Sequence, residues 1–214
     1  MPGPIQAVLF DFDGTLVDSE PLHYDCWMQA VRPFGGGMDW GRYTQRLTGR
    51  TDLEAGRILL SEAGHEPTEE LIREVLQVKR TAFHDRFCDE LSIQSEIIDW
   101  IDETVTYLSL AVVSSSLRSE VEPLLVQAGI LSSLDAVVCG DDVHRHKPDP
   151  EPYLLALERL TGRGKAIHPQ NCLVFEDSAA GVAAARAAGM TVFQVSTPDE
   201  LLPLLRKKVP LRDS

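Results

Sequence analysis

The chain of 214 residues is long enough for one large domain or for a core with a smaller inserted domain. Its composition, with 43% hydrophobic and 25% charged residues, is that of a folded globular protein and not of a disordered one. The formal net charge of -13 argues against nucleic acid or an anionic membrane as a partner, because either would require a basic surface. An anionic small molecule is compatible with this charge if a metal ion or a lysine supplies local positive charge.

The cysteines and the N-terminal residues indicate the compartment. The four cysteines are scattered and form no CxxC pair. We expect all four to be reduced thiols, as is typical of cytoplasmic proteins. The first residues lack the pattern of a signal peptide, and no apolar run approaches the length that spans a membrane. The sequence therefore predicts a cytoplasmic protein without a membrane partner.

Five short apolar runs are predicted to be strands. Each is continuous and not alternating, which is expected of strands that are covered on both faces of a sheet. In chain order they are Ile5–Phe10, Leu108–Val113, Ala136–Cys139, Cys172–Phe175 and Thr191–Val195. Helical patterns lie before and between the later strands, at 94–106, 119–128, 150–160 and 179–188, and a capping box at Thr197–Glu200 predicts a last helix. This alternation predicts a doubly wound α/β core with a parallel sheet.

The segment between the first two strands, 11–107, is far too long for a single crossover connection. Its pattern is helical from Pro21 to about Phe87, with breaks at glycines. The sequence therefore predicts an all-helical cap domain, 18–89, inserted into an α/β core that consists of 1–17 and 90–214.

The stretch AVLFDFDGT places Asp11 and Asp13 directly after the first predicted strand. Two carboxylates that close repel each other and resist desolvation, so that a fold tolerates them where a cation lies between them. Gly14 and Thr15 follow at once and predict a tight turn with a hydroxyl and backbone amides at the same place. We therefore expect a cation and an anionic ligand at this turn.

The other strands also end in residues with functional side chains. Ligands of an open parallel sheet bind beyond the carboxyl ends of the strands. Ser114 and Ser115 follow the second predicted strand, Lys147 follows the third, and Glu176 and Asp177 follow the fourth. Oxygen ligands without converging His or Cys indicate a hard cation, most simply Mg²⁺. One aspartate could then attack phosphorus, and its neighbour could protonate the leaving oxygen and activate water.

Four motifs in this order resemble those of the haloacid dehalogenase superfamily, in its phosphatase and phosphomutase branch. They are DFDGTLVDS, Ser114 after LAVV, Lys147 in HKPDP, and VFEDSAAGVAAARAAGM. The resemblance covers essentially the whole chain and includes the helical cap. It implies a Rossmann-like core and a reaction on a phosphate monoester.

The resemblance also implies a role for each motif residue. It makes Asp11 the nucleophile and Asp13 the general acid and base, with the backbone carbonyl of Asp13 also on the metal. Asp177, assisted by Glu176, completes the magnesium site together with Asp11. Ser114 and Lys147 are expected to hold the phosphoryl oxygens. The expected binding residues for phosphate and substrate are Gly14, Thr15, Ser115, His23 and Arg50.

We therefore expect a monomeric Mg²⁺-dependent phosphatase of a small phosphorylated metabolite, a sugar or polyol phosphate, which acts through an aspartyl-phosphate. A β-phosphoglucomutase-like mutase is the alternative. Such mutases share His23, but they carry an arginine three residues after the cap-loop glycine, where this chain has Asp52. An alternative of another class is a signalling module regulated by phosphorylation of an aspartate, which would have a similar acidic cluster but no long helical insert and no need of Asp13.

Overall fold

The computed structural model describes residues 3–48, 50–162 and 166–211. The chain divides into two compact units. The core unit consists of Met1–Asp18 and Leu91–Ser214, and the helical unit consists of Ser19–Glu90. These boundaries lie one residue further along the chain than those expected from the sequence. Each unit is described by itself.

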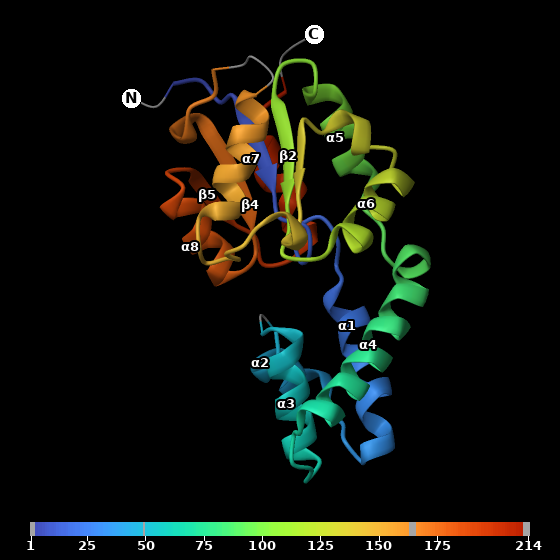
Figure 1. Ribbon diagram of the computed structural model, residues 1–214. Coiled ribbons are helices and arrows are strands. Elements are labelled where there is room, and N and C mark those ends of the chain that lie inside the picture. The colour runs from blue at the N-terminus through green and yellow to red at the C-terminus, as the bar shows by residue number, and fades with distance from the viewer. Residues whose placement is uncertain (1–2, 49, 163–165, 212–214) are drawn as a thin grey trace. The chain divides into compact units, whose positions relative to one another are not determined.

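The core unit is built on a five-stranded parallel sheet with the order β3-β2-β1-β4-β5 (Figure 1). The strands are β1 (Ala7–Phe10), β2 (Ser109–Val113), β3 (Ala136–Val138), β4 (Cys172–Glu176) and β5 (Thr191–Gln194). The central strand β1 pairs with β2 on one side and with β4 on the other. The predicted parallel α/β core is confirmed, and the strand order brings the ends of β1, β2 and β4 together.

Helices flank the sheet on both faces. The α-helices of the core unit are α5 (Ser95–Thr104), α6 (Arg118–Gln127), α7 (Glu151–Thr161), α8 (Ala179–Ala187) and α9 (Leu201–Lys208). Short 3₁₀ turns lie at Leu131–Ser133, Gly140–Asp142, Pro169–Asn171 and Pro198–Glu200. Both the helices and the strands follow the sequence in the predicted alternation.

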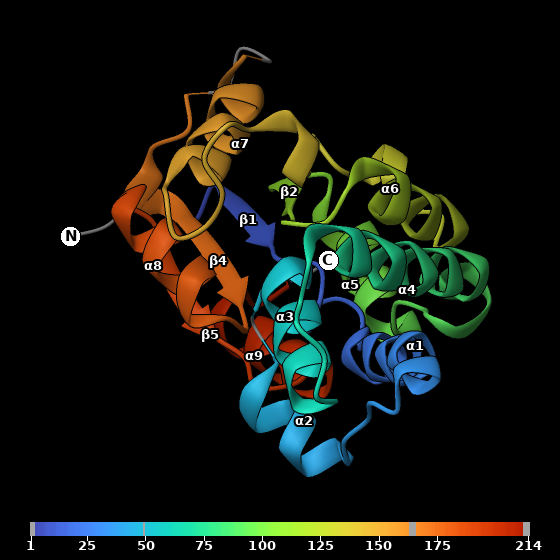
Figure 2. The same cartoon turned by 60° about the horizontal axis from the view of Figure 1, so that its bottom comes forward.

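One face of the sheet packs against α7 and α8, which lie together beside β1 and β4 in Figure 2. The shared core on this face includes Leu9, Ala111, Val113 and Val174 of the strands, Tyr153, Ala156 and Leu160 of α7, and Ala184 and Ala185 of α8. On the opposite face the Phe10 ring meets the Trp100 ring of α5 edge to face, with centroids 6.1 Å apart. The buried central strands therefore hold their carboxyl ends on a rigid support.

The last predicted strand and helix differ from expectation. Thr191 and Gln194 of β5 are exposed, so the expectation that every strand is covered on both faces is wrong for this strand. The reason is its position, because β5 lies at the edge of the sheet. The capping box at Thr197 is wrong as well: the Glu200 carboxylate accepts a hydrogen bond from the Ser196 amide at 2.8 Å, and α9 begins only at Leu201.

The helical unit contains α1 (Glu20–Val31), a 3₁₀ turn (Arg32–Phe34), α2 (Trp40–Arg46), α3 (Asp52–Glu62) and α4 (Glu69–Glu90). Helices α1 and α4 lie side by side (Figure 1). Its own hydrophobic core includes Trp27, Val31, Tyr43, Leu59, Leu60, Ile72 and Val75. The start of α3 is fixed by a capping box between Thr51 and Glu54. An all-helical insert between the first two strands is what the sequence predicts.

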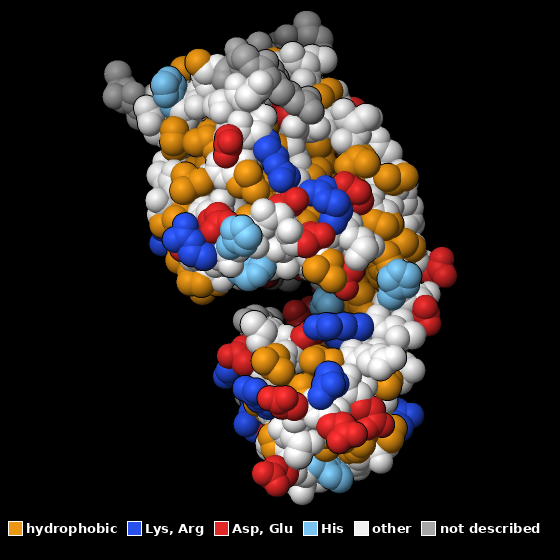
Figure 3. Space-filling view, in the orientation of Figure 1, with side chains coloured by type: hydrophobic (Ala, Val, Ile, Leu, Met, Phe, Trp, Pro, Cys, Tyr) orange, Lys and Arg blue, Asp and Glu red, His pale blue; other side chains and the backbone are white. Residues whose placement is uncertain are grey.

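The surface carries charges of both signs. On the face shown in Figure 3, Lys and Arg side chains lie among Asp and Glu side chains and do not form a continuous basic surface. Among the described residues, no helix combines the length and the apolar character that crossing a membrane requires.

Candidate active site

The turn after β1 positions the first acidic residues. The Asp11 amide donates to the Phe175 carbonyl at 2.9 Å, so Asp11 continues the pairing of β1 with β4. Gly14 has a φ of +79° and its amide donates to the Val17 carbonyl at 2.8 Å, which closes the turn. A Cβ atom on Gly14 would lie 2.4 Å from Oδ2 of Asp177. Glycine thus permits both the turn and the close approach of the Asp177 carboxylate.

Lys147 joins the acidic residues of two neighbouring strands. Its Nζ lies 2.5 Å from Oδ1 of Asp11, 2.5 Å from Oε1 of Glu176 and 3.0 Å from the Val113 carbonyl oxygen. Only 5% of its side chain is exposed. Burial by itself would lower the pKa of Lys147, but Asp11 and Glu176 outweigh burial and hold this pKa well above its usual range. Lys147 is therefore a fixed positive charge at the end of the sheet.

Glu176 is fully buried and receives hydrogen bonds on both carboxylate oxygens. Its Oε1 accepts from Lys147 and, at 3.3 Å, from the hydroxyl of Tyr153. Its Oε2 accepts from the amide and the hydroxyl of Ser178, at 2.8 and 2.9 Å. Burial raises the pKa of Tyr153 well above its usual range, against the opposing charge of Lys147, so the hydroxyl keeps its proton and donates it. The Glu176 carboxylate is held in one orientation by these donors.

Asp11, Glu176 and Asp177 form the acidic cluster of the core unit, with one carboxylate oxygen of each within 4.8 Å of the others. Burial raises the pKa of Asp11 well above its usual range; Lys147 opposes this effect, while Glu176 and Asp177 add to it. Burial and Glu176 also raise the pKa of Asp177 to about 6. A further positive charge would relieve this repulsion. Closely spaced carboxylate oxygens fit a hard divalent cation such as Mg²⁺.

Asp13 is contacted by serines of the loop after β2. The Ser116 hydroxyl donates to Oδ2 of Asp13 at 2.6 Å, and the Ser114 hydroxyl lies 3.5 Å from the same atom. The Ser116 amide also donates to the Ser114 hydroxyl at 2.9 Å, and Ser114 is buried while Ser115 is exposed. The structure thus brings Ser116 to the site, although it was absent from the expected site residues. A run of three serines does not reveal from sequence which of them turns inward.

Thr15 lies in the same turn and is fully buried. Among the described residues its hydroxyl oxygen has no hydrogen-bond partner. A buried hydroxyl without a partner is costly unless a ligand completes it. Thr15 and Gly14 therefore remain suitable binding groups for an anion at the end of β1.

The remaining expected residues, His23 and Arg50, belong to the helical unit. The His23 ring stacks on the Phe83 ring, with centroids 4.3 Å apart and an interplanar angle of 5°. Arg50 is exposed, and its Nε donates to the Arg46 carbonyl at 2.6 Å. The neighbouring glycine of the cap loop, Gly49, lies outside the described residues.

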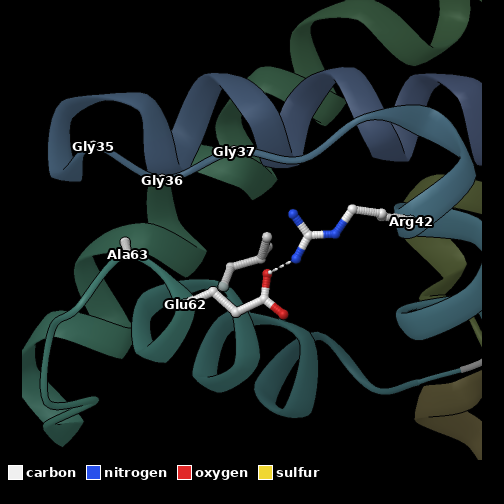
Figure 4. Close-up of a pocket in the computed structure, with 7 residues that line it drawn as sticks. Gly35, Gly36, Gly37, Arg42, Glu62 and Ala63 are labelled. Carbon is white, nitrogen blue, oxygen red and sulfur yellow. Dashed lines mark hydrogen bonds and ion pairs between the residues drawn. The ribbon is translucent and has the colours of Figure 1, made fainter.

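A cavity of about 250 Å³ within the helical unit is separate from the acidic cluster in sequence and in chemistry. It is lined by Gly35, Gly36, Gly37, Arg42, Leu59, Glu62 and Ala63. Figure 4 shows the Arg42 guanidinium directed at the Glu62 carboxylate, which Arg46 also contacts. Glu62 is the one carboxylate among these lining residues and is paired with two arginines, so this cavity lacks the closely spaced carboxylates of the acidic cluster.

Comparison with known proteins places this arrangement in a family. The sequence profile of the haloacid dehalogenase-like hydrolases matches residues 8–195. Fructose-1-phosphate phosphatase YqaB of Escherichia coli is 32% identical over 88% of this chain and 95% of its own. A phosphorylated carbohydrates phosphatase of Thermotoga maritima is 31% identical over 87% of this chain and 82% of its own.

A solved structure agrees with these relatives. CbbY from Rhodobacter sphaeroides, in complex with phosphate, superposes with a TM-score of 0.71 and 29% sequence identity, over 88% of this chain and 84% of its own. The matched profile spans all four motifs, from Asp11 to Asp177. The chain belongs to the haloacid dehalogenase-like hydrolases.

Proposed function

We propose that the protein is a Mg²⁺-dependent phosphatase that hydrolyses a sugar or polyol phosphate through an aspartyl-phosphate on Asp11. The observation that carries this proposal is the contact of Lys147 with both Asp11 and Glu176, beside Asp177. A carboxylate next to a fixed ammonium and a cation site can attack phosphorus, because both positive charges offset the charge of the phosphate.

The chemistry divides between Asp11 and Asp13. In the first step a carboxylate oxygen of Asp11 bonds to phosphorus, the bond from phosphorus to the ester oxygen breaks, and Asp13 gives its proton to that oxygen. In the second step Asp13 takes a proton from water, whose oxygen bonds to phosphorus as the bond to Asp11 breaks. The product is inorganic phosphate, and both aspartates return to their first state.

The groups around these aspartates bind the phosphoryl oxygens. We assign this role to Lys147 and Ser114, and to the donors of Gly14, Thr15 and Ser115. The metal would be held by Asp11, the backbone carbonyl of Asp13 and Asp177, with Glu176 beside them. Bound there, Mg²⁺ would neutralise charge on the phosphoryl group. Lys147 opposes the rise in the pKa of Asp11 that burial causes, and so favours the ionised form that a nucleophile requires.

The substrate class rests on the relatives and on the helical unit. The two similar phosphatases are named for fructose 1-phosphate and for phosphorylated carbohydrates. This favours a phosphorylated sugar or a related polyol as the substrate of this chain. We assign recognition of the leaving group to His23 and Arg50. Alanine at either position should raise KM more than it lowers kcat.

Mutase activity is the less favoured alternative. The position that carries arginine in such mutases is Asp52, which accepts a hydrogen bond from the buried ammonium of Lys79 at 2.8 Å. An acidic residue paired in this way does not offer the positive charge that would bind a second phosphate. A signalling module is disfavoured by Asp13, since a phosphorylated switch needs no general acid.

The test is phosphate release across a panel of hexose, pentose, polyol and 2-deoxysugar phosphates with Mg²⁺. Release from one or a few of these compounds supports the phosphatase and identifies the substrate class. Release from none, together with conversion of β-glucose 1-phosphate to the 6-phosphate in the presence of a bisphosphate primer, would replace the proposal by the mutase.

A further inference from the structure

Tyr153 of α7 contacts the catalytic lysine in two ways. Its hydroxyl donates to Oε1 of Glu176, the same oxygen that accepts from Lys147. Its ring lies beneath the ammonium, with Lys147 Nζ 5.2 Å from the ring centroid, a distance at which a cation is attracted to an aromatic face. Tyr153 is 0% exposed, so this hydroxyl cannot exchange its partner for bulk water.

The groups around Glu176 confine its carboxylate to one position. Ser178 occupies Oε2 from one side, while Lys147 and Tyr153 occupy Oε1 from the other. Gly181 of α8 faces the carboxylate so closely that a Cβ atom there would lie 1.6 Å from Oε1. The carboxylate is therefore enclosed between α7 and α8, and Tyr153 is the part of α7 that bonds to it.

The position of Glu176 matters because Lys147 has three N–H donors and all three are in use. Their acceptors are Asp11, Glu176 and the Val113 carbonyl. A phosphoryl oxygen must replace one of these acceptors. The neutral carbonyl at 3.0 Å is the weakest of the three, since hydrogen bonds to charged groups are stronger. When Glu176 is held in place, the Lys147 ammonium keeps its hydrogen bonds to Asp11 and Glu176. It then exchanges the hydrogen bond to the Val113 carbonyl for one to the phosphoryl group.

We propose that Tyr153 is a positioning residue of the active site, which acts through Glu176 to direct the Lys147 ammonium toward the phosphoryl group. This inference rests on the proposed function, because that function assigns Lys147 to the phosphoryl oxygens. Tyr153 touches neither the substrate nor the reacting atoms. Its removal should therefore slow the chemical step without changing which compounds bind.

The test variant is Tyr153→Phe, which removes the hydroxyl and keeps the ring. For the best phosphate monoester, kcat should fall about 10- to 150-fold, the loss expected from one hydrogen bond to a charged group, while KM changes less than about 2-fold. In a Glu176→Gln background the same change should have little further effect, because the tyrosine acts through Glu176. Independent, multiplicative losses in the double variant would overturn the proposal.

The matched control is Tyr43→Phe. Tyr43 is also a buried tyrosine whose hydroxyl donates to a carboxylate, Oε1 of Glu20, at 2.7 Å. The Tyr43→Phe substitution removes the same hydroxyl group as Tyr153→Phe, so any general effect of losing a buried hydroxyl appears in both variants as a lowered Tm. Unchanged kcat in Tyr43→Phe supports a specific role of Tyr153. Equal losses of kcat in the two variants would show a merely structural effect and contradict the proposal.

A second readout does not depend on turnover. In protein with isotope-labelled lysine, the Lys147 side-chain NMR signal is identified by its disappearance in Lys147→Met. Tyr153→Phe should shift this signal, and Tyr43→Phe should not. A signal unchanged in Tyr153→Phe would overturn the positioning role. If wild-type protein releases phosphate from no monoester but the signal shifts, the proposed function fails while the link from Tyr153 to Lys147 stands.

Discussion

The Lys147 ammonium and the Asp11 carboxylate, 136 residues apart in the chain, lie 2.5 Å apart at the carboxyl end of β1. The contact joins the loop before α7 to the central strand. It gives the buried Asp11 carboxylate a fixed positive neighbour, which opposes the rise in the pKa of Asp11 that burial causes.

Replacing Gly181 should disturb the active site, because this glycine lies against the Glu176 carboxylate. In Gly181→Ala the new methyl group would occupy the space of the Glu176 carboxylate, so Glu176 must move and Lys147 loses an acceptor. We expect the free energy of unfolding to fall by about 1 to 3 kcal/mol, as for other overpacked cores. Phosphate release should also fall at least about 10-fold, a loss typical of displaced supporting groups. Urea unfolding and steady-state kinetics measure the two effects.

The control for Gly181→Ala is Gly56→Ala in α3. There the nearest atom to a new Cβ is a Trp27 ring carbon at 3.5 Å, an ordinary contact. Alanine favours a helix over glycine by about 1 kcal/mol, so this variant should be as stable as wild type or more stable. A Gly181→Ala variant that behaved like Gly56→Ala would show that Glu176 is not confined as described.

Metal removal should abolish turnover reversibly. Excess chelator should stop phosphate release, and added Mg²⁺ should restore it. In Asp177→Asn the Mg²⁺ concentration for half-maximal rate should rise at least about 10-fold, because a charged ligand is lost from the cluster. Asp85→Asn, an exposed substitution on α4, is the control and should leave that concentration unchanged. Full activity in excess chelator would remove the metal from the mechanism.

The hydroxyl of Ser116 should assist Asp13. In Ser116→Ala, Oδ2 of Asp13 loses the donor at 2.6 Å, and the carboxyl group is free to turn away from the leaving oxygen. We expect kcat to fall about 3- to 10-fold, the worth of one hydrogen bond. The same substitution at Ser133, in a 3₁₀ turn of the core unit, should leave kcat unchanged. Wild-type kcat in Ser116→Ala would show that this contact does not orient Asp13.

Much of the site follows from the sequence, and the remainder depends on packing. The ends of parallel strands meet at one sheet edge, so the sequence alone groups Asp11, Lys147 and Asp177. The inward turn of Ser116 could not, because it depends on one rotation within a loop of three similar residues. Tyr153 looks like an ordinary core residue of an amphipathic helix, and only the placement of α7 against β2 and β3 brings its hydroxyl to Glu176.

Like the site, the fold follows partly from the sequence and partly from packing. The periodicity of apolar residues predicts the five strands and the inserted helices. The exposure of β5 depends on its place at the sheet edge, which the local sequence does not encode. The failed capping box at Thr197 reflects competition between local hydrogen bonds, since Glu200 finds the Ser196 amide instead.

Asp142 should make stability depend on pH. Its Oδ2 accepts from Arg118 and Arg159 and from the Cys139 amide. Although burial opposes it, these donors lower the folded-state pKa of Asp142 below its usual value of 3.8. The stabilisation is therefore complete above the unfolded-state pKa and is lost as the pH falls through the folded-state pKa.

The variant Asp142→Asn tests this dependence. At neutral pH it should lower the free energy of unfolding by about 1 to 3 kcal/mol, and the difference from wild type should shrink below pH of about 4. Asp99→Asn, at an exposed position of α5, should show neither effect. Urea unfolding between pH 3 and 7 measures both. A difference that stays constant over this range would contradict the assignment to the Asp142 charge.

The measurement that tests the central claim most directly is phosphate release by wild type and by Asp11→Asn, with Mg²⁺ and the best monoester of the panel. The account predicts turnover in wild type and a loss of at least about 1,000-fold in Asp11→Asn, as for other nucleophiles. Circular dichroism and Tm should show that the variant still folds. Substantial turnover in a folded Asp11→Asn protein would contradict the account, because another group would then have to attack phosphorus.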